Sequence, residues 1–275
     1  MSWICRGLEF EPAQTPLASA SDDPAAVATA IRGVLKVTPS EQREWESSAM
    51  AFDRWRESLE RSGHLVFLLS LGKGSSQGFS LWDEFAPLVA VNTAWNESAR
   101  IFTMFHELGH LVTRTSSACL EPTRTSSRTD PLERWCEQFA ASVLLPTKDV
   151  EAALRQHGWN SRVQVTDLSL AKRLASLYKV SLRASVIRMI EIGAATWALY
   201  DQIPAASDAK PVGGGGRGRS RTEIREDQLG DRASFLFVEA VNREILDRSQ
   251  AVELLDIPEV TFDALANPEA GHLGG

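Results

Sequence analysis

Apolar residues recur at helical spacing in several segments of the chain. Residues 40–62 carry such a stripe, and Ser40 is suited to cap the start of one long helix there. Residues 97–113 carry a denser stripe, which predicts a buried helix. Its apolar members are Ile101, Phe102, Phe105, Leu108, Leu111 and Val112.

Three short apolar runs lie between these two helices. They span residues 64–71, 78–82 and 87–92, and their length and composition predict strands. The order of a helix, three strands and a second helix indicates an α+β fold with a small three-stranded sheet.

Residues 161–201 show a different pattern. Two short helices meet at Val180-Ser181, which has the character of a turn and a cap, so the segment has the outline of a helix-turn-helix. We prefer the interpretation that this pair packs on the preceding domain, with direct DNA binding as the less favoured alternative.

Changes in composition and the positions of glycine and proline divide the chain into six segments. We expect an irregular N-terminal segment (1–40) with one short helix at 24–36, a compact domain (41–160), the helix-turn-helix-like unit (161–201), a Gly/Arg-rich linker (202–222), a C-terminal helical segment (223–266) that begins with one helix over 223–247, and a frayed tail (267–275).

The overall composition is that of a soluble globular protein, with 43% hydrophobic and 24% charged residues. No apolar run approaches the ~18 residues that a membrane span requires, and the first ten residues lack a secretory signal. Three cysteines without CxxC spacing favour a reducing cytoplasm. A net charge of −7 argues against a general polyanion binder, and the basic cluster at 217–221 is interpreted as solvated linker.

The helix at 97–113 contains the strongest chemical signal, the pentapeptide His106-Glu107-Leu108-Gly109-His110. Histidines four residues apart lie on one helical face, so both imidazoles can bind a single Zn²⁺ while Glu107 reaches a water on the metal. The alternative is a pair of ordinary histidines on an amphipathic helix.

A catalytic zinc needs a third protein ligand. A metzincin-type histidine is excluded, because Thr113 and Ser116 occupy the positions of its glycine and third histidine. We assign Glu133 on the predicted helix 131–145 as the ligand. Glu137, one turn along, is then placed to hold the free ring N–H of a zinc histidine.

The alternative for this glutamate pair is a solvated helix face. Apolar neighbours mark the helix as largely buried, and a buried acidic pair needs a partner, which favours metal binding. These neighbours are Leu132, Phe139, Ala140 and Val143.

Two segments together resemble the ImmA/IrrE family of metallopeptidases: ARIFTMFHELGHLV (99–112) and ERWCEQFAASVLLP (133–146). Residues 78–92 and 168–193 extend the resemblance, which covers about residues 50–195. It implies a zincin-like core, with His106, His110 and Glu133 as zinc ligands and Glu107 as the catalytic glutamate. The chain departs from the family pattern at Cys136 (usually Ala), Glu137 (usually Asn or Asp) and Leu145 (usually Met).

The resemblance also implies a function. We expect a cytoplasmic zinc endopeptidase that cleaves a specific protein, a helix-turn-helix repressor or an antitoxin, and so derepresses stress, phage or mobile-element genes. No membrane partner is expected. The alternatives are a non-catalytic, metal-containing regulator that binds a protein or DNA and, with less support, a zinc hydrolase of small molecules.

Peptide hydrolysis would require further groups around the metal. The substrate is expected to add as a strand beside an exposed edge, formed by residues 87–92 with Val89 and Val91 or by residues 78–82. The residue that stabilises the oxyanion is left open among Tyr178, Tyr200, His64 and His157.

Overall fold

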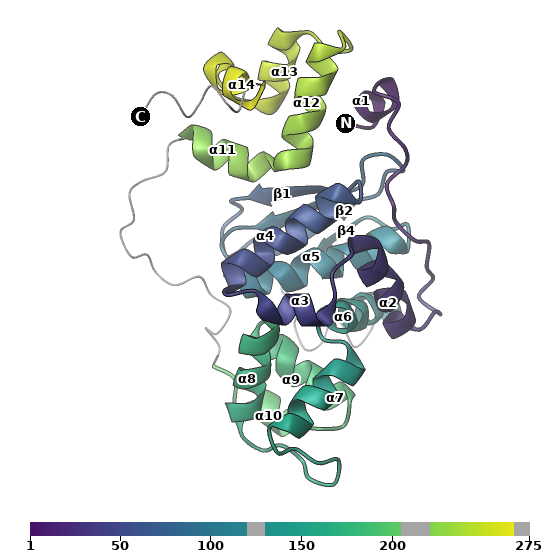
Figure 1. Ribbon diagram of the computed structural model, residues 1–275, viewed down its shortest axis with the longest axis vertical. Coiled ribbons are helices and arrows are strands. Elements are labelled where there is room, and N and C mark those ends of the chain that lie inside the picture. The colour runs from purple at the N-terminus through teal and green to yellow at the C-terminus, as the bar shows by residue number, and fades with distance from the viewer. Residues whose placement is uncertain (120–129, 205–220, 267–275) are drawn as a thin grey trace.

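The computed structural model describes residues 1–119, 130–204 and 221–266. Helices surround one small sheet (Figure 1). The helices are α1 (Ser2–Gly7), α2 (Pro24–Leu35), α3 (Pro39–Glu44), α4 (Ser48–Arg61), α5 (Glu97–Val112), α6 (Pro131–Leu144), α7 (Thr147–Gln156), α8 (Leu168–Tyr178), α9 (Leu182–Glu191), α10 (Trp197–Tyr200), α11 (Arg221–Leu229), α12 (Asp231–Asn242), α13 (Arg248–Leu255) and α14 (Glu259–Ala266). The strands are β1 (Leu65–Leu69), β2 (Gly78–Leu81), β3 (Leu88–Asn92) and β4 (Ser117–Cys119).

The sheet has the strand order β1-β3-β2-β4. β1 runs parallel to β3, whereas β2 is antiparallel to both β3 and β4. The three predicted strands and the α+β architecture are therefore confirmed. The sheet also gains a fourth strand, β4, which begins five residues after α5 ends and pairs with Gly78, Phe79 and Ser80.

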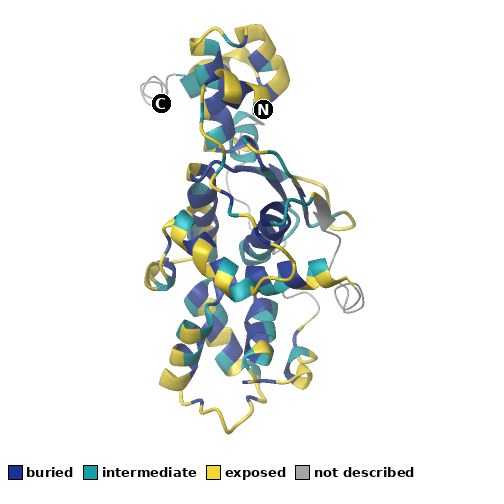
Figure 2. Cartoon of the chain, turned by 90° about the vertical axis from the view of Figure 1, so that its right-hand side faces the viewer, coloured by how far each residue is buried: buried dark blue, intermediate teal, exposed yellow. Residues whose placement is uncertain are grey.

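Each face of the sheet packs against a different group of helices. Val66 and Val89 belong to the larger core that contains α4, α5, α6 and the α8–α9 pair. Leu65 on the opposite face belongs to a second core, formed with α1 and with α11 to α14 (Figure 1). Figure 2 shows β1, β3 and α5 as the buried centre between these groups.

The segment predicted as one helix at 40–62 forms two helices instead. Thr38, rather than Ser40, caps α3 by accepting a hydrogen bond from Glu41 N, and Ser47 caps α4 by accepting one from Met50 N. Between them the backbone is extended at Trp45, whose ring packs edge-on against Trp55 at 5.2 Å between centroids. The apolar stripe continued across this break because Trp45 contributes to the same core.

The predicted helix at 223–247 is also divided in two, at Gly230. This residue has a φ of 80°, and a Cβ there would stand 2.2 Å from Oε1 of Glu60 on α4. Oε2 of Glu60 accepts hydrogen bonds from the backbone N–H groups of Asp231 (3.2 Å) and Arg232 (3.3 Å). Glu60 therefore caps α12 from another part of the chain, which explains why local sequence did not reveal the break.

The N-terminal segment is more ordered than expected. Helix α2 forms as predicted, with the Asp23 side chain as its N-cap. The segment also contains α1, whose Ile4 and Cys5 are buried against the C-terminal helices. The structure therefore corrects the expectation of irregular chain at residues 2–7, whereas residues 10–19 form no helix or strand, as expected.

The helix-turn-helix-like pair forms where it was predicted. Ser181 follows the turn and caps α9 by accepting a hydrogen bond from Ala184 N. The buried side chains of α8 and α9 join the main core. No helix in residues 1–119, 130–204 or 221–266 is long and apolar enough to cross a membrane. Residues 120–129, most of the predicted linker (205–220) and the predicted tail (267–275) lie outside the described residues.

Candidate metal centre

Helix α5 presents two histidines from one face. Asn96 caps the helix by accepting a hydrogen bond from Ala99 N, and the helix then runs without interruption through the pentapeptide to Val112. His106 and His110 are both buried, and their Nε2 atoms lie 3.3 Å apart. One face of one helix thus brings two nitrogen donors to a common point.

Glu133 completes this group from the first turn of α6, which begins after Asp130 as N-cap. Its Oε2 lies 3.2 Å from Nε2 of His106 and its Oε1 lies 3.4 Å from Nε2 of His110. Ligands about 2.1 Å from a tetrahedral zinc stand about 3.4 Å from one another. Each histidine lies near this spacing from one carboxylate oxygen of Glu133, and one donor atom from each of the three residues lies within 4.8 Å of the others, so the group could hold one metal ion.

The electrostatics of the group suit a divalent cation. Burial, assisted by the neighbouring His106, lowers the pKa of His110 to about 4, so this imidazole is neutral near pH 7. A hydrogen bond from His106 holds the pKa of the Glu133 carboxyl below its usual value. Neutral imidazole nitrogens beside a carboxylate are the donor types found in zinc sites.

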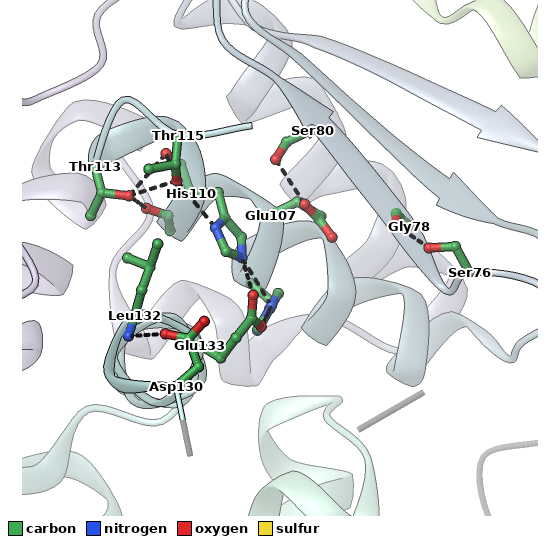
Figure 3. A network of polar contacts seen from close by, with 12 residues as sticks. Ser76, Gly78, Ser80, Glu107, His110, Thr113, Thr115, Asp130, Leu132 and Glu133 are labelled. Atoms are coloured by element: carbon green, nitrogen blue, oxygen red, sulfur yellow. Dashed lines mark hydrogen bonds and ion pairs between the residues drawn. The ribbon is translucent and has the colours of Figure 1, made fainter. Parts of the chain in front are cut away.

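Glu107 lies on the side of α5 that faces the sheet. Its side chain is fully buried, and Ser80 Oγ on β2 donates a 2.8 Å hydrogen bond to Glu107 Oε2 (Figure 3). β2 approaches α5 closely here: a Cβ at Gly78 would stand 2.6 Å from Cγ2 of Thr103. The sheet therefore fixes the carboxylate beside the metal-binding group.

The second ring nitrogen of His110 has a partner that sequence reasoning missed. Nδ1 of His110 lies 3.2 Å from Oγ1 of Thr115, three residues beyond the end of α5. The one sequence signal was the density of hydroxyl residues just after the helix. Glu137 is half-buried one turn along α6 from Glu133, and its role at a histidine ring remains a prediction.

The strand predicted to receive substrate is not an edge. Val89 and Val91 lie on β3, which pairs with β1 on one side and β2 on the other, and both side chains are fully buried. The alternative at residues 78–82 is wrong too, because β2 lies between β3 and β4. The pairing of β4 with β2 could not be anticipated from a three-residue strand.

Three of the four oxyanion candidates have partners elsewhere in the fold. The ring nitrogens of His64 each lie 2.9 Å from a hydroxyl, of Thr15 and of Ser62. The hydroxyls of Tyr178 and Tyr200 accept hydrogen bonds from Arg43 and Arg183. The fourth, His157, follows α7 at its C-terminal end. These contacts do not connect any of the four to the metal-binding group.

Helix α6 is anchored at its C-terminal end by side chains from three other helices. Val143 O accepts a hydrogen bond from Arg32 of α2, Leu144 O accepts one from Gln42 of α3, and Leu145 O accepts one from Arg188 of α9. Carbonyls at this end of a helix lack intrahelical partners, and positive charge there is favourable. The anchors fix the helix that carries Glu133.

No curated protein matches the chain. Residues 59–189 match the family model described as the IrrE N-terminal-like domain. This span starts near the end of α4 and runs through the sheet, the two helices with the metal-binding donors and most of α9. The domain at residues 59–189 therefore belongs to the ImmA/IrrE family, and the protein is a metallopeptidase.

Proposed function

We propose that this metallopeptidase is a zinc-dependent endopeptidase that hydrolyses one peptide bond in a specific protein. The main support for this proposal is the short distance, 3.2 to 3.4 Å, between donor atoms of His106, His110 and Glu133. The buried carboxylate of Glu107 lies beside them. A purely structural metal site has no need of such a carboxylate.

The three donors would hold the metal ion and leave a fourth position open. Zinc in such a site supplies Lewis acidity, which polarises a carbonyl and lowers the pKa of water. Glu107 would accept the proton of the attacking water at a carboxylate oxygen and deliver it to the leaving amine. Ser80, bonded to Oε2, holds the carboxylate in place for both transfers.

The substrate would add to the sheet beside β4. Among the described residues, β4 pairs with β2 on one side only, and it follows directly after the helix that carries the histidines. β1, at the other edge, has its Val66 carbonyl occupied by Arg56 Nη2 at 2.7 Å. An extended peptide recognised by backbone pairing therefore has β4 as its candidate edge.

The family resemblance supports a helix-turn-helix repressor or an antitoxin as the substrate, whose cleavage would derepress stress, phage or mobile-element genes. The proposal includes a cytoplasmic location. The free, buried thiol of Cys5 supports a reducing compartment.

Elemental mass spectrometry of purified protein tests the metal site. We expect about one zinc per wild-type chain, a strongly reduced content in Glu133→Ala, and a retained content in Glu107→Gln. Wild-type protein that binds no zinc when metal is abundant would contradict the proposal and favour a non-catalytic regulator.

A second experiment tests catalysis and identifies the substrate. New protein N-termini in the native host are compared between cells with wild-type protein and cells with Glu107→Gln. A cleavage product of a transcriptional regulator that appears only with the wild type supports the proposal. Identical patterns in the two strains under inducing conditions contradict it.

A further inference from the structure

Two threonines form a compact hydroxyl cluster where α5 ends (Figure 3). Thr115 Oγ1 lies 3.2 Å from Nδ1 of His110 and 3.1 Å from the His110 carbonyl oxygen. Thr113 Oγ1 lies 3.1 Å from Thr115 Oγ1 and 3.0 Å from the same carbonyl. The cluster therefore surrounds the side of His110 opposite its metal-facing nitrogen.

The hydrogen bonds around Thr115 allow the Nδ1-protonated tautomer of His110. Thr113 Oγ1 can donate to Gly109 O at 3.1 Å, which leaves a lone pair of the His110 carbonyl for the Thr115 hydroxyl beside the Thr115 N–H. A threonine hydroxyl has one proton and two lone pairs. When that proton goes to the carbonyl oxygen of His110, a lone pair remains to accept from Nδ1–H. The imidazole then carries its proton on Nδ1 and presents the lone pair of Nε2 toward Glu133 and His106.

The backbone places Thr115 for this contact. Arg114 adopts a φ of 58°, a left-handed conformation that is uncommon outside glycine and asparagine. This turn lets Thr115 N donate to His110 O at 2.9 Å and folds the threonine back over the helix end. The Arg114 guanidinium stacks 3.7 Å from the Trp82 ring centroid and donates to the backbone carbonyls of Leu111 and Thr15. These contacts hold the left-handed turn.

We propose that Thr115 is a positioning residue for the metal centre, one that holds His110 as the Nδ1-protonated tautomer ready to bind zinc through Nε2. The proposal rests on the proposed function, because it requires zinc at this site. It assigns to a hydroxyl on the chain after α5 the orienting role that zinc histidines commonly receive from a carboxylate or a carbonyl.

Zinc affinity, measured by competition with a chromophoric chelator, tests the proposal. Thr115→Val removes the hydroxyl and keeps the shape of the side chain, and we expect about 10- to 100-fold weaker zinc binding. Thr115→Ser should restore affinity to near the wild-type value. The matched control is Thr103→Val on α5. The Thr103 hydroxyl donates a hydrogen bond to Ala99 O and contacts no histidine, so the zinc affinity of this variant should stay unchanged.

A spectroscopic readout separates orientation from general destabilisation. With zinc in excess, the Nδ1–H proton of His110 should give a slowly exchanging NMR signal in the wild type and in Thr115→Ser. In Thr115→Val that signal should shift and exchange rapidly. Thermal melting verifies folding, and Thr115→Ala replaces the valine variant if the latter does not fold.

The outcomes distinguish the two proposals. Equal zinc affinity in Thr115→Val and the wild type, with an unchanged Nδ1–H signal, overturns the role of Thr115 and leaves the peptidase proposal intact. A wild-type protein without zinc affinity overturns both.

Discussion

Gly109 of α5 lies directly against Cys136 of α6. A Cβ at position 109 would stand 3.0 Å from Sγ of Cys136 and 3.2 Å from its Cα. The two helices therefore approach closely at the fourth residue of the His-Glu-Leu-Gly-His motif. Cys136 lies one turn after Glu133, so this close contact brings the carboxylate within reach of both histidines.

The first prediction concerns this contact. Gly109→Ala adds a methyl group 3.0 to 3.2 Å from atoms of Cys136, which is tighter than an ordinary contact, so α6 must shift away from α5 by a few tenths of an ångström. We expect zinc affinity to fall about tenfold or more and the melting temperature to fall. The control is Gly33→Ala on α2, where a Cβ meets nothing within 4 Å and should stabilise the fold by about 0.5–1 kcal/mol. Equal zinc affinity in both variants would contradict the argument.

The second prediction concerns Ser80. Ser80→Ala removes the hydrogen bond to Glu107 without touching a metal-binding donor. Zinc content should stay near one per chain, while kcat on the identified substrate should fall about tenfold or more, because hydrogen bonds to charged groups contribute about 1.5–3 kcal/mol. Ser98→Ala on α5 is the matched control, since that hydroxyl bonds Ser48. An unchanged kcat in Ser80→Ala would show that Glu107 needs no such support.

The third prediction concerns the anchor at the end of α6. Arg188 is buried and donates to Leu145 O at 2.8 Å and to Thr147 Oγ1 at 2.7 Å. Arg188→Met should lower the free energy of unfolding by about 2–4 kcal/mol, because it leaves a buried carbonyl without its donor. Arg155→Met breaks an exposed pair with Glu151 and should cost under about 1 kcal/mol. Urea unfolding of both variants measures these changes. Equal losses of unfolding free energy in the two variants would contradict the anchoring role of Arg188.

The fourth prediction concerns acid stability. Burial lowers the pKa of His64 from 6.5 to about 4. As the pH falls from 6.5 toward 4, the unfolded chain binds a proton at this residue while the folded chain does not, so stability is lost on acidification. The His64 contribution is about 2 kcal/mol at pH 5 relative to pH 7.

Urea unfolding at pH 7 and pH 5, with a chelator present, measures this effect. His64→Gln cannot take up the proton, so its stability should fall less between the two pH values than that of the wild type. The other histidines contribute equally to the pH dependence of stability in the wild type and in His64→Gln. The same pH dependence in both would show that His64 is not the acid-sensitive group.

Local signals predicted the elements that hold the metal ligands. Asn96 and Asp130 are caps next to the helices they start, and the spacing of His106 and His110 follows from helical periodicity alone. The missed features depend on residues distant in sequence or on backbone conformation. Glu60 caps α12 across more than 150 residues, and Thr115 reaches His110 only because Arg114 takes a left-handed turn.

The C-terminal helices and α1 have a consequence for how the protein can be divided. Leu65 of the sheet is buried in the core that these helices build, and the capping contact of Glu60 joins them to α4. A fragment limited to the family match at 59–189 would expose that apolar face to water and lose α2 and α3, which hold the end of α6. The residues that match the family model are thus fewer than the residues that must fold together as one unit.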